Sequence, residues 1–257
     1  MNLKDKKIGL ALGGGAVLGA AHIGVLKALH EHGIEINAIS GTSIGALIGA
    51  LYAFGKSPDE IEQIALGINW KKLSSFSLSR FGVLSNEKIG AIISEHFGDV
   101  HFSDAKMALN MVATDITTGE KVILGEGSVK EAVMASCCLP GLFIPVEMDG
   151  RLLVDGGLVE NVPCRTLKEH DIDYTIAVDL NAKHSFKKPE GIVGVLLNTF
   201  DFIFNASTSL QLQESDFVIR PDLSRFNAIN TSQIEALIES GYHETCKQLK
   251  DEVPLAP

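Results

Sequence analysis

Two stretches near the start of the chain decide its fold: KIGLALGGGAVLGAAHIGVLKAL at residues 7–29 and INAISGTSIGALIGALYAF at residues 36–54. Each begins with a short apolar run that predicts a strand, at residues 7–12 and 36–40. Each then reaches a tight turn rich in glycine and continues with apolar residues at helical spacing. Repeated units of strand, turn and helix predict a parallel sheet that is buried on both faces, because the strands of such sheets are continuously hydrophobic. The two stretches therefore predict the core of an α/β protein.

The same stretches have the length of membrane spans, since residues 8–26 and 36–55 carry no formal charge when histidine is neutral. The first imitates a signal peptide, but Asp5 interrupts its basic start and the glycines at 13–15 would break an apolar helix. The second is polar in its first half. We therefore expect core elements of a cytoplasmic protein, with a transient contact at a membrane surface left open.

Composition and charge narrow the class further. The chain has 257 residues, of which 46% are hydrophobic, so it is not a disordered protein and is predicted to form one domain over residues 1–257. Its net charge of −10 argues against nucleic acid as a partner and against polybasic attachment to anionic lipid. Four cysteines show no metal-ligand spacing, so we expect reduced thiols, no metal and no cofactor.

The rest of the chain predicts elements of both kinds. The expected strands are residues 110–114, 121–124, 151–154, 174–180 and 217–220. The expected helices are residues 129–137, 191–212 and 232–250. Strands that alternate with helices in this way agree with an α/β architecture.

The second glycine turn, GTSIG at residues 41–45, has the G-x-S-x-G pattern between a strand and a helix. Such a turn exposes the central serine hydroxyl at the carboxyl end of the sheet, and the flanking glycines remove side chains that would clash. Ser43 is therefore a candidate nucleophile. The turn at residues 41–45 is here called the elbow, and Gly41 and Gly45 are its flanking glycines. Small residues also make purely structural turns, in which Ser43 would only cap the helix.

The first glycine turn, GGGAVLG at residues 13–19, lies at a strand end and opens a helix, so its amides suit an anion. A dinucleotide site would need G-x-G-x-x-G spacing and an acid after the second strand, and a P-loop would need Lys and Ser/Thr after Gly19. Neither requirement is met. The remaining use is an oxyanion hole beside Ser43, because neighbouring parallel strands end side by side.

A nucleophilic serine needs a base. Of the eight histidines, His22 follows the glycine turn most closely, and without a paired acid it is typical of a structural histidine. Aspartates follow three predicted strands, at Asp115, Asp155 and Asp179. Asp155 is distinguished by the two glycines after it, which let the backbone approach closely, although Asp-Gly is also an ordinary turn pair.

Four motifs occur in the order LALGGGAVLGAAHIGVLKAL, GTSIG, SCCLPGLFIPV and VDGGLVENVP, and together they resemble the patatin-like phospholipase family. The resemblance covers about residues 7–180, and residues 191–251 follow as a C-terminal strand and helices. It implies a three-layer α/β fold in which helices flank a mainly parallel sheet. It also implies a serine acyl hydrolase that uses a Ser–Asp dyad. The implied residues are Ser43 as nucleophile, Asp155 as base, and Gly156 and Gly157 as the glycines of the DGG motif.

The resemblance further implies that the amides of Gly14, Gly15 and Ala16 form the oxyanion hole. The sequence departs from the family pattern twice within this turn. Leu18 stands where a basic residue is usual, and Ala16 stands where a glycine is usual. Because an oxyanion hole uses backbone N–H groups, Ala16 can still donate if its backbone conformation suits alanine. We expect the loss of the basic residue to change substrate preference or weaken activity.

The sequence thus predicts an enzyme that cleaves acyl esters of lipids. Two alternatives stay open: a nucleotide-binding α/β protein whose glycine turn holds a phosphate, and a non-catalytic relative that acts by binding, which the residue at position 18 suggests. The helix at residues 191–212 is typical of core packing, with pocket lining, membrane contact and dimerisation as other roles. Residues 67–84, which include Trp70 and Phe76, are a candidate lid. Neither the acyl chain and head group nor the oligomeric state follows from these motifs.

Overall fold

The computed structural model of the chain describes residue 3 and residues 6–68, 75–76, 84–183, 188–189 and 191–252. The strands of the main sheet are β1 (Ile8–Leu12), β2 (Ile36–Thr42), β5 (Ala108–Asp115), β6 (Lys121–Leu124), β7 (Val146–Met148), β8 (Arg151–Asp155), β9 (Tyr174–Val178) and β10 (Phe217–Ile219). Their order is β10–β9–β1–β2–β5–β8–β7, with β6 also beside β5. The first five strands in this order run parallel, whereas β6, β7 and β8 form antiparallel pairs.

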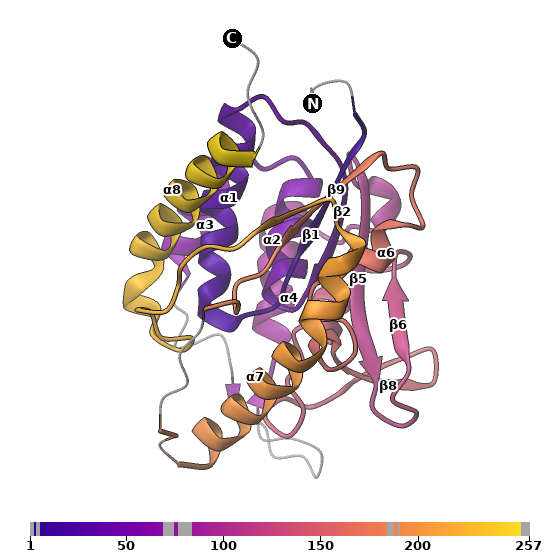
Figure 1. Cartoon of the computed structure of the whole chain (residues 1–257). Coiled ribbons are helices and arrows are strands. Elements are labelled where there is room, and N and C mark those ends of the chain that lie inside the picture. The colour runs from indigo at the N-terminus through magenta and orange to yellow at the C-terminus, as the bar shows by residue number, and fades with distance from the viewer. Residues whose placement is uncertain are drawn as a thin grey trace.

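Helices and short turns connect these strands (Figure 1). The helices are α1 (Ala20–Glu31), α2 (Ile44–Ala53), α3 (Pro58–Gly67), α4 (Glu87–Phe97), α5 (Val129–Ser136), α6 (Cys164–Leu167), α7 (Gly191–Gln211) and α8 (Ile234–Glu252). Two 3₁₀ turns, η2 (Ala16–Gly19) and η5 (Gly156–Leu158), follow β1 and β8. The short strands β3 (Ser75–Phe76) and β4 (Leu84–Ser85) pair outside the main sheet.

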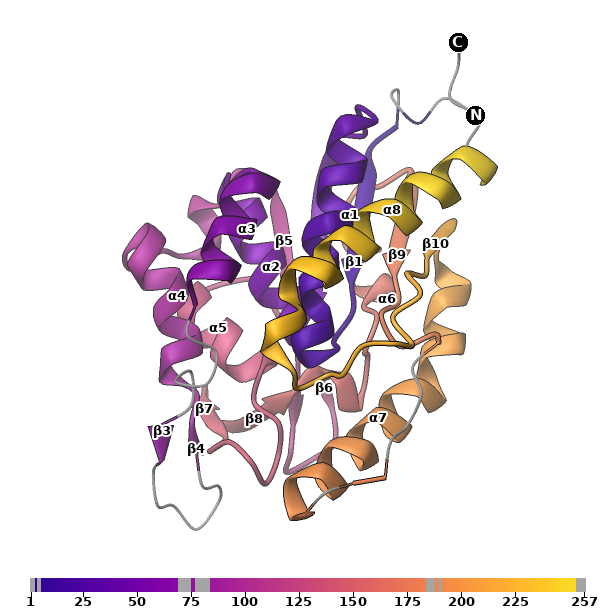
Figure 2. The same ribbon diagram turned by 90° about the vertical axis from the view of Figure 1, so that its left-hand side faces the viewer.

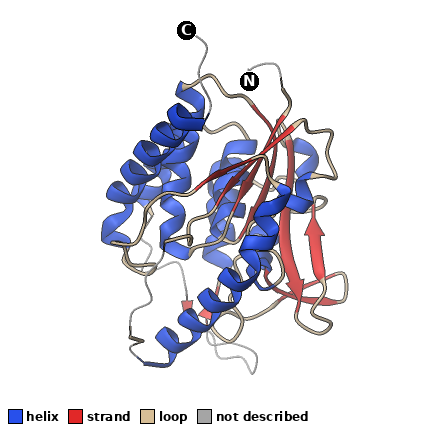
Figure 3. Cartoon of the chain, viewed as in Figure 1, coloured by secondary structure: helices blue, strands red, loops and turns tan. Residues whose placement is uncertain are grey.

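The core lies on both faces of the sheet, as the alternation of side chains along β1 illustrates. Leu12 points into the larger hydrophobic cluster, which includes residues of α1, α2 and α8 such as Leu47. Ala11 points into a smaller cluster on the other face with Leu167 of α6. Figure 3 shows the strands between these helices. The fold is therefore α/β with a mostly parallel central sheet flanked by helices, which confirms the predicted class.

The two charge-free stretches are divided among separate elements of this core. The first forms β1, η2 and the start of α1, and the second forms β2 and α2. Among the helices in the described part of the chain, none combines the length and the apolar character that crossing a bilayer requires. The predicted strands and helices are confirmed within a few residues, while β7 was missed because three residues carry too little pattern. The candidate lid at residues 67–84 lies largely outside the described residues.

Strand register brings the three predicted turns to one edge of the sheet. Leu12, the last residue of β1, pairs with Gly41 of β2, so the glycine turn and the GTSIG turn leave the sheet side by side. Strand β2 continues to Thr42, two residues beyond the predicted end, because Thr42 still pairs with Val112 of β5. The next residue of β5, Ala113, pairs with Asp155 at the end of β8. The register thus places Asp155 beside the turn that follows Thr42.

Candidate active site

Ser43 occupies a sharp turn between β2 and α2, with φ of 54° and ψ of −125°. A positive φ is sterically costly for serine, by about 1–2 kcal/mol, so the surroundings must hold the turn in place. The glycines on both sides are required by close packing. A Cβ on Gly45 would lie 2.2 Å from the Leu12 carbonyl oxygen, and one on Gly41 would lie 2.6 Å from the Ala46 backbone. The local sequence therefore suits the tight turn that was predicted.

Ser136, at the end of α5, ties this turn to the sheet. The Ser43 backbone N–H donates to the Ser136 hydroxyl at 2.9 Å, and that hydroxyl donates to the Val112 carbonyl at 2.7 Å. Ser136 is completely buried. Sequence reasoning did not single out Ser136, although the SCCLPG motif that begins with it was noted. The hydrogen bonds give this serine a role that its position in the motif did not reveal.

Asp155 is held by three hydrogen bonds at the end of β8. Its backbone N–H donates to the Cys138 carbonyl at 2.8 Å, and its own carbonyl accepts from the Thr114 hydroxyl at 2.9 Å. Carboxylate Oδ1 accepts from the Gly157 amide at 2.8 Å. The two glycines of the motif allow this turn, because a Cβ on Gly156 would lie 2.2 Å from the Val112 carbonyl oxygen. The turn fixes the carboxylate relative to β5.

The Asp155 carboxyl is fully buried and close to Ser43. Burial raises the pKa of Asp155 to about 6, while the Gly157 amide and the Ser43 hydroxyl act to lower it. The second oxygen, Oδ2, has no regular hydrogen-bond partner among the described residues. The hydroxyl and the carboxyl are therefore neighbours without a well-formed hydrogen bond between them.

The glycine turn presents two free amides next to Ser43. The Gly14 amide donates to the Asn161 carbonyl at 3.2 Å, and the Gly14 carbonyl accepts from the Asn181 side chain at 3.1 Å. No acceptor is found in the described part of the chain for the amides of Gly15 and Ala16. A Cβ on Gly14 would lie 3.4 Å from the Ser43 Cβ, so the loop and the serine are in contact. Of the three amides expected to form an oxyanion hole, that of Gly14 already donates to Asn161, and those of Gly15 and Ala16 remain available.

The two departures from the family pattern have different structural consequences. Ala16 has φ of 49°, in the left-handed region that favours glycine, so its backbone is strained. Leu18 is buried in the hydrophobic core, and it is not part of the cavity lining beside Ser43. Position 18 therefore contributes to packing in this protein.

His22 supports the glycine turn through a hydrogen bond to the backbone of that turn. Its Nε2 lies 2.7 Å from the Gly13 carbonyl oxygen, to which a neutral imidazole donates. The side chain is fully buried, and burial lowers the pKa of His22 to about 4 even though the bond to Gly13 acts to raise it. The imidazole is therefore neutral near pH 7, which agrees with the structural role that we predicted.

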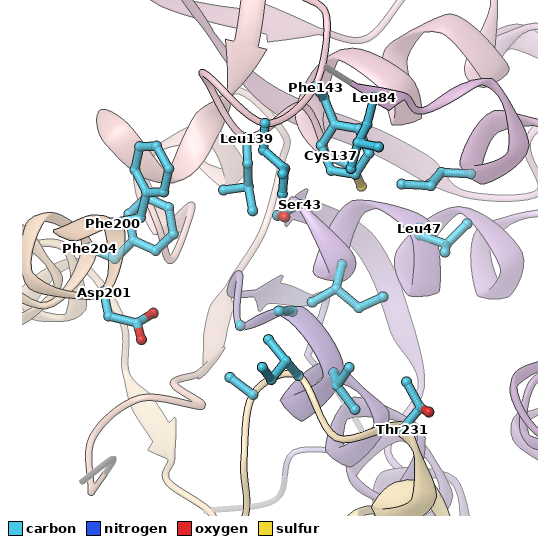
Figure 4. Close-up of a pocket in the computed structure, with 18 residues that line it drawn as sticks. Ser43, Leu47, Leu84, Cys137, Leu139, Phe143, Phe200, Asp201, Phe204 and Thr231 are labelled. Atoms are coloured by element: carbon cyan, nitrogen blue, oxygen red, sulfur yellow. The ribbon is translucent and has the colours of Figure 1, made fainter. Parts of the chain in front are cut away.

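A cavity of about 360 Å³ opens above Ser43 and is lined mainly by apolar side chains. Figure 4 shows Ser43 between Phe200 and Phe204 of α7 on one side and Leu84 and Phe143 on the other. The remaining lining residues are Gly15, Ala16, Val17, Ile44, Leu47, Ile89, Cys137, Leu139, Leu142, Asp201, Ala228, Ile229 and Thr231. Both residues with free amides belong to the lining, so the serine and the amides face one apolar space.

The Cys137 thiol also faces this space, next to Ser43 and Asp155. Burial and the nearby carboxylate raise the pKa of Cys137 well above its usual range. A thiol in that state is a poor nucleophile, because only the thiolate attacks readily. The Ser43 hydroxyl lies close to the same buried carboxyl and acts to lower its pKa.

A sequence model described as patatin-like phospholipase matches residues 10–168. An uncharacterized NTE family protein of Mycobacterium tuberculosis is 37% identical over 182 residues, which are 70% of this chain and 50% of that protein. The lysophospholipase NTE1 of Candida glabrata is 35% identical over 190 residues, which are 70% of this chain and 11% of that enzyme. The chain thus spans half or less of the length of these relatives.

The structural comparison concerns the fold alone. The crystal structure of VipD from Legionella pneumophila matches with a TM-score of 0.69 at 16% sequence identity. The match covers 96% of this chain and 67% of the VipD chain. The arrangement of sheet and helices described above therefore occurs in a protein of very different sequence.

Proposed function

The chain belongs to the patatin-like phospholipase family, and from that premise we propose that it is a lipid acyl hydrolase that works through Ser43 and Asp155. One observation carries the proposal. Ser43, on a strained turn, faces an apolar cavity together with two unpaired backbone amides, and a buried carboxyl lies next to it. An apolar wall suits an acyl chain, and unpaired amides suit the anion that forms when an ester carbonyl is attacked.

In the first half of the proposed reaction, the Asp155 carboxylate takes the proton of the Ser43 hydroxyl as the oxygen attacks the ester carbonyl carbon. The carbonyl oxygen becomes an oxyanion that accepts hydrogen bonds from the amides of Gly15 and Ala16. Collapse of this intermediate breaks the bond to the alcohol, which leaves with the proton from Asp155. The acyl group then remains on Ser43.

In the second half, a water molecule attacks the acyl-serine while Asp155 accepts one of its protons. The same amides bind the second oxyanion, and collapse releases the carboxylic acid and returns the proton to Ser43. Each amide in such a hole is worth on the order of 10²–10³ in rate. Asp155 is suited to this exchange because its raised pKa, about 6, makes it a stronger base than an exposed aspartate while leaving it ionised at pH 7.

The proposal is tested with a fluorophosphonate probe and with p-nitrophenyl butyrate. Wild-type protein should be labelled on serine and should hydrolyse the ester, and Ser43→Ala should lose both properties. Ser240→Ala is a matched control, because Ser240 is another buried serine, lies on α8, and donates its hydroxyl to the Asp222 carbonyl at 3.4 Å. Labelling that persists in Ser43→Ala would show that a different serine is the nucleophile. A folded wild type that is never labelled would favour the non-catalytic binding protein.

A further inference from the structure

Helix α7 is apolar on two faces. Its inner residues Phe200 and Phe204 are buried against the cavity above Ser43. Its outer face carries exposed apolar side chains at spacings of three, seven and eight residues, which keep them on one side of the helix. These residues, here called the outer stripe, are Ile192 (81% exposed), Val195 (52%), Phe202 (55%), Ile203 (39%) and Leu210 (62%).

The outer stripe is not interrupted by charge. Residues 191–211 contain no Lys or Arg and a single acid, Asp201, which lines the cavity. Among the described residues, eight large hydrophobic side chains are exposed; five form the outer stripe, and a sixth, Ile229, belongs to the cavity lining. The stripe extends along a helix about 30 Å long. Apolar surface concentrated in this way marks a binding surface, because its exposure to water is unfavourable.

The position of the outer stripe indicates what binds there. The stripe and a wall of the cavity are two faces of one helix, and Ile229, 61% exposed, connects the cavity lining with the molecular surface. Figure 2 shows α7 at an edge of the molecule, apart from α1, α3 and α8. A second copy of the chain seated on α7 would obstruct this side of the cavity. A lipid layer would instead place acyl chains, which suit an apolar cavity, beside the helix that forms one wall of that cavity.

We propose that α7 docks this protein on the surface of a phospholipid bilayer, with the outer stripe among the acyl chains. An acyl chain then reaches Ser43 past Phe200 and Phe204 without crossing water. The idea rests on the proposed function of the cavity, since it identifies a bilayer as the place from which the substrate comes. Because α7 has no basic residue and the chain carries a net charge of −10, apolar insertion drives the docking, and attraction to anionic head groups does not.

Docking is tested by flotation of the full chain with vesicles of pure phosphatidylcholine, in a Ser43→Ala background so that binding is separate from turnover. We expect binding that is insensitive to salt and no tighter when phosphatidylserine is added. Adding Phe202→Gln or Leu210→Gln should lower the partition coefficient at least about tenfold each, because each removes one inserted apolar side chain. Leu66→Gln on α3 is the matched control, since Leu66 is also exposed (39%) and lies on another part of the surface.

Vesicle binding that is unchanged in both α7 variants would overturn the docking proposal. A wild-type dimer in sedimentation equilibrium that dissociates with Phe202→Gln would also overturn it and would identify a second copy as the occupant. The soluble ester separates this proposal from the proposed function. If the wild type hydrolyses p-nitrophenyl butyrate but does not bind vesicles, the docking proposal is wrong and the proposed function stands. If the wild type binds vesicles but does not hydrolyse the ester, the proposed hydrolase function is wrong and the docking proposal stands.

Discussion

The two strand–turn–helix units at the start of the chain share a local plan but expose different groups. Both place a residue other than glycine in the left-handed region, Ala16 with φ of 49° and Ser43 with φ of 54°. At Ser43 the backbone N–H is bound by Ser136, and the side chain is what remains available. At the glycine turn the amides of Gly15 and Ala16 lack acceptors in the described residues, and the backbone itself is available. The chemistry of a turn thus depends on which of its groups the neighbours already satisfy.

The buried Asp155 carboxyl lies beside the elbow, and removing it should have the largest effect. We expect Asp155→Asn to lower kcat/KM for p-nitrophenyl butyrate about 10³-fold, which is within the range of a lost general base. In the wild type, kcat/KM should rise with pH and level off above an apparent pKa near 6, because Asp155 must be ionised and burial raises its pKa to about 6. A pH–rate profile that is flat between pH 5 and pH 7 would exclude Asp155 as the base.

The elbow is also tightly packed against the backbone of β1. Gly45→Ala should lower the free energy of unfolding by at least about 3 kcal/mol, because the new Cβ would lie 2.2 Å from the backbone oxygen of Leu12. Gly67→Ala is the control, since Gly67 ends α3 and a Cβ there has no neighbour within 4 Å. Its effect should stay within about 0.5 kcal/mol. Urea denaturation measures both changes, and equal values would mean that the elbow tolerates the extra carbon.

His22 beside the glycine turn and Asp155 beside the elbow are both buried, and burial moves their pKa values in opposite directions. The pKa of His22 falls from 6.5 to about 4, so the unfolded chain binds the extra proton between these values and stability falls as pH falls. The pKa of Asp155 rises from 3.8 to about 6, so the folded chain binds the extra proton and stability rises as pH falls. The two effects oppose each other in the wild type.

Asp155→Asn should remove the pH-dependent contribution of Asp155 to stability and leave that of His22. Relative to the wild type, the variant should lose about 2 kcal/mol of stability on going from pH 7 to pH 4, because only the His22 effect is left. Chemical denaturation at several pH values measures the difference. A difference that does not change with pH would mean that the folded state does not raise the pKa of Asp155.

The Ser43 amide has the Ser136 hydroxyl as its acceptor, and this hydrogen bond distinguishes it from the free amides of the glycine turn. Ser136→Ala should reduce kcat about tenfold and leave KM nearly unchanged, because the Ser43 amide loses its acceptor and the nucleophile is less well oriented. Thr245→Val is matched, since the Thr245 hydroxyl is equally buried and donates to the Gly241 carbonyl at 2.7 Å within α8. Thr245→Val should affect stability alone. If the two variants have the same kcat, Ser136 has only a structural role.

The smallest expected effect is at the strained residue of the glycine turn. Ala16→Gly should stabilise the protein by about 1 kcal/mol, because glycine adopts a positive φ without steric cost. Ala206→Gly, at an exposed position of α7, should have the opposite sign and a similar size, because glycine is unfavourable in a helix. Thermal unfolding measures both. Destabilisation by Ala16→Gly would show that the turn is not strained at this residue.

Much of the fold could be predicted because its signals are local. The apolar run at Ile8–Leu12, the glycines after it and the G-x-S-x-G turn around Ser43 each specify their own backbone. The end of β2 was placed two residues too early, since pairing of Gly41 and Thr42 with β5 extends the strand. The engagement of the Gly14 amide could not be predicted either, because its acceptor, Asn161, comes from a distant segment.

The sequence by itself determined the α/β class, the family resemblance and the residues expected to react, because glycine spacing and apolar runs act through neighbours in the chain. The tertiary structure alone decided which groups remain free to act. Ser136 reaches Ser43 across 93 residues, and the cavity over Ser43 is assembled from segments between Gly15 and Thr231. Such contacts depend on how strands order and register in the sheet. No local pattern contains that information, since it is set by the packing of the whole chain.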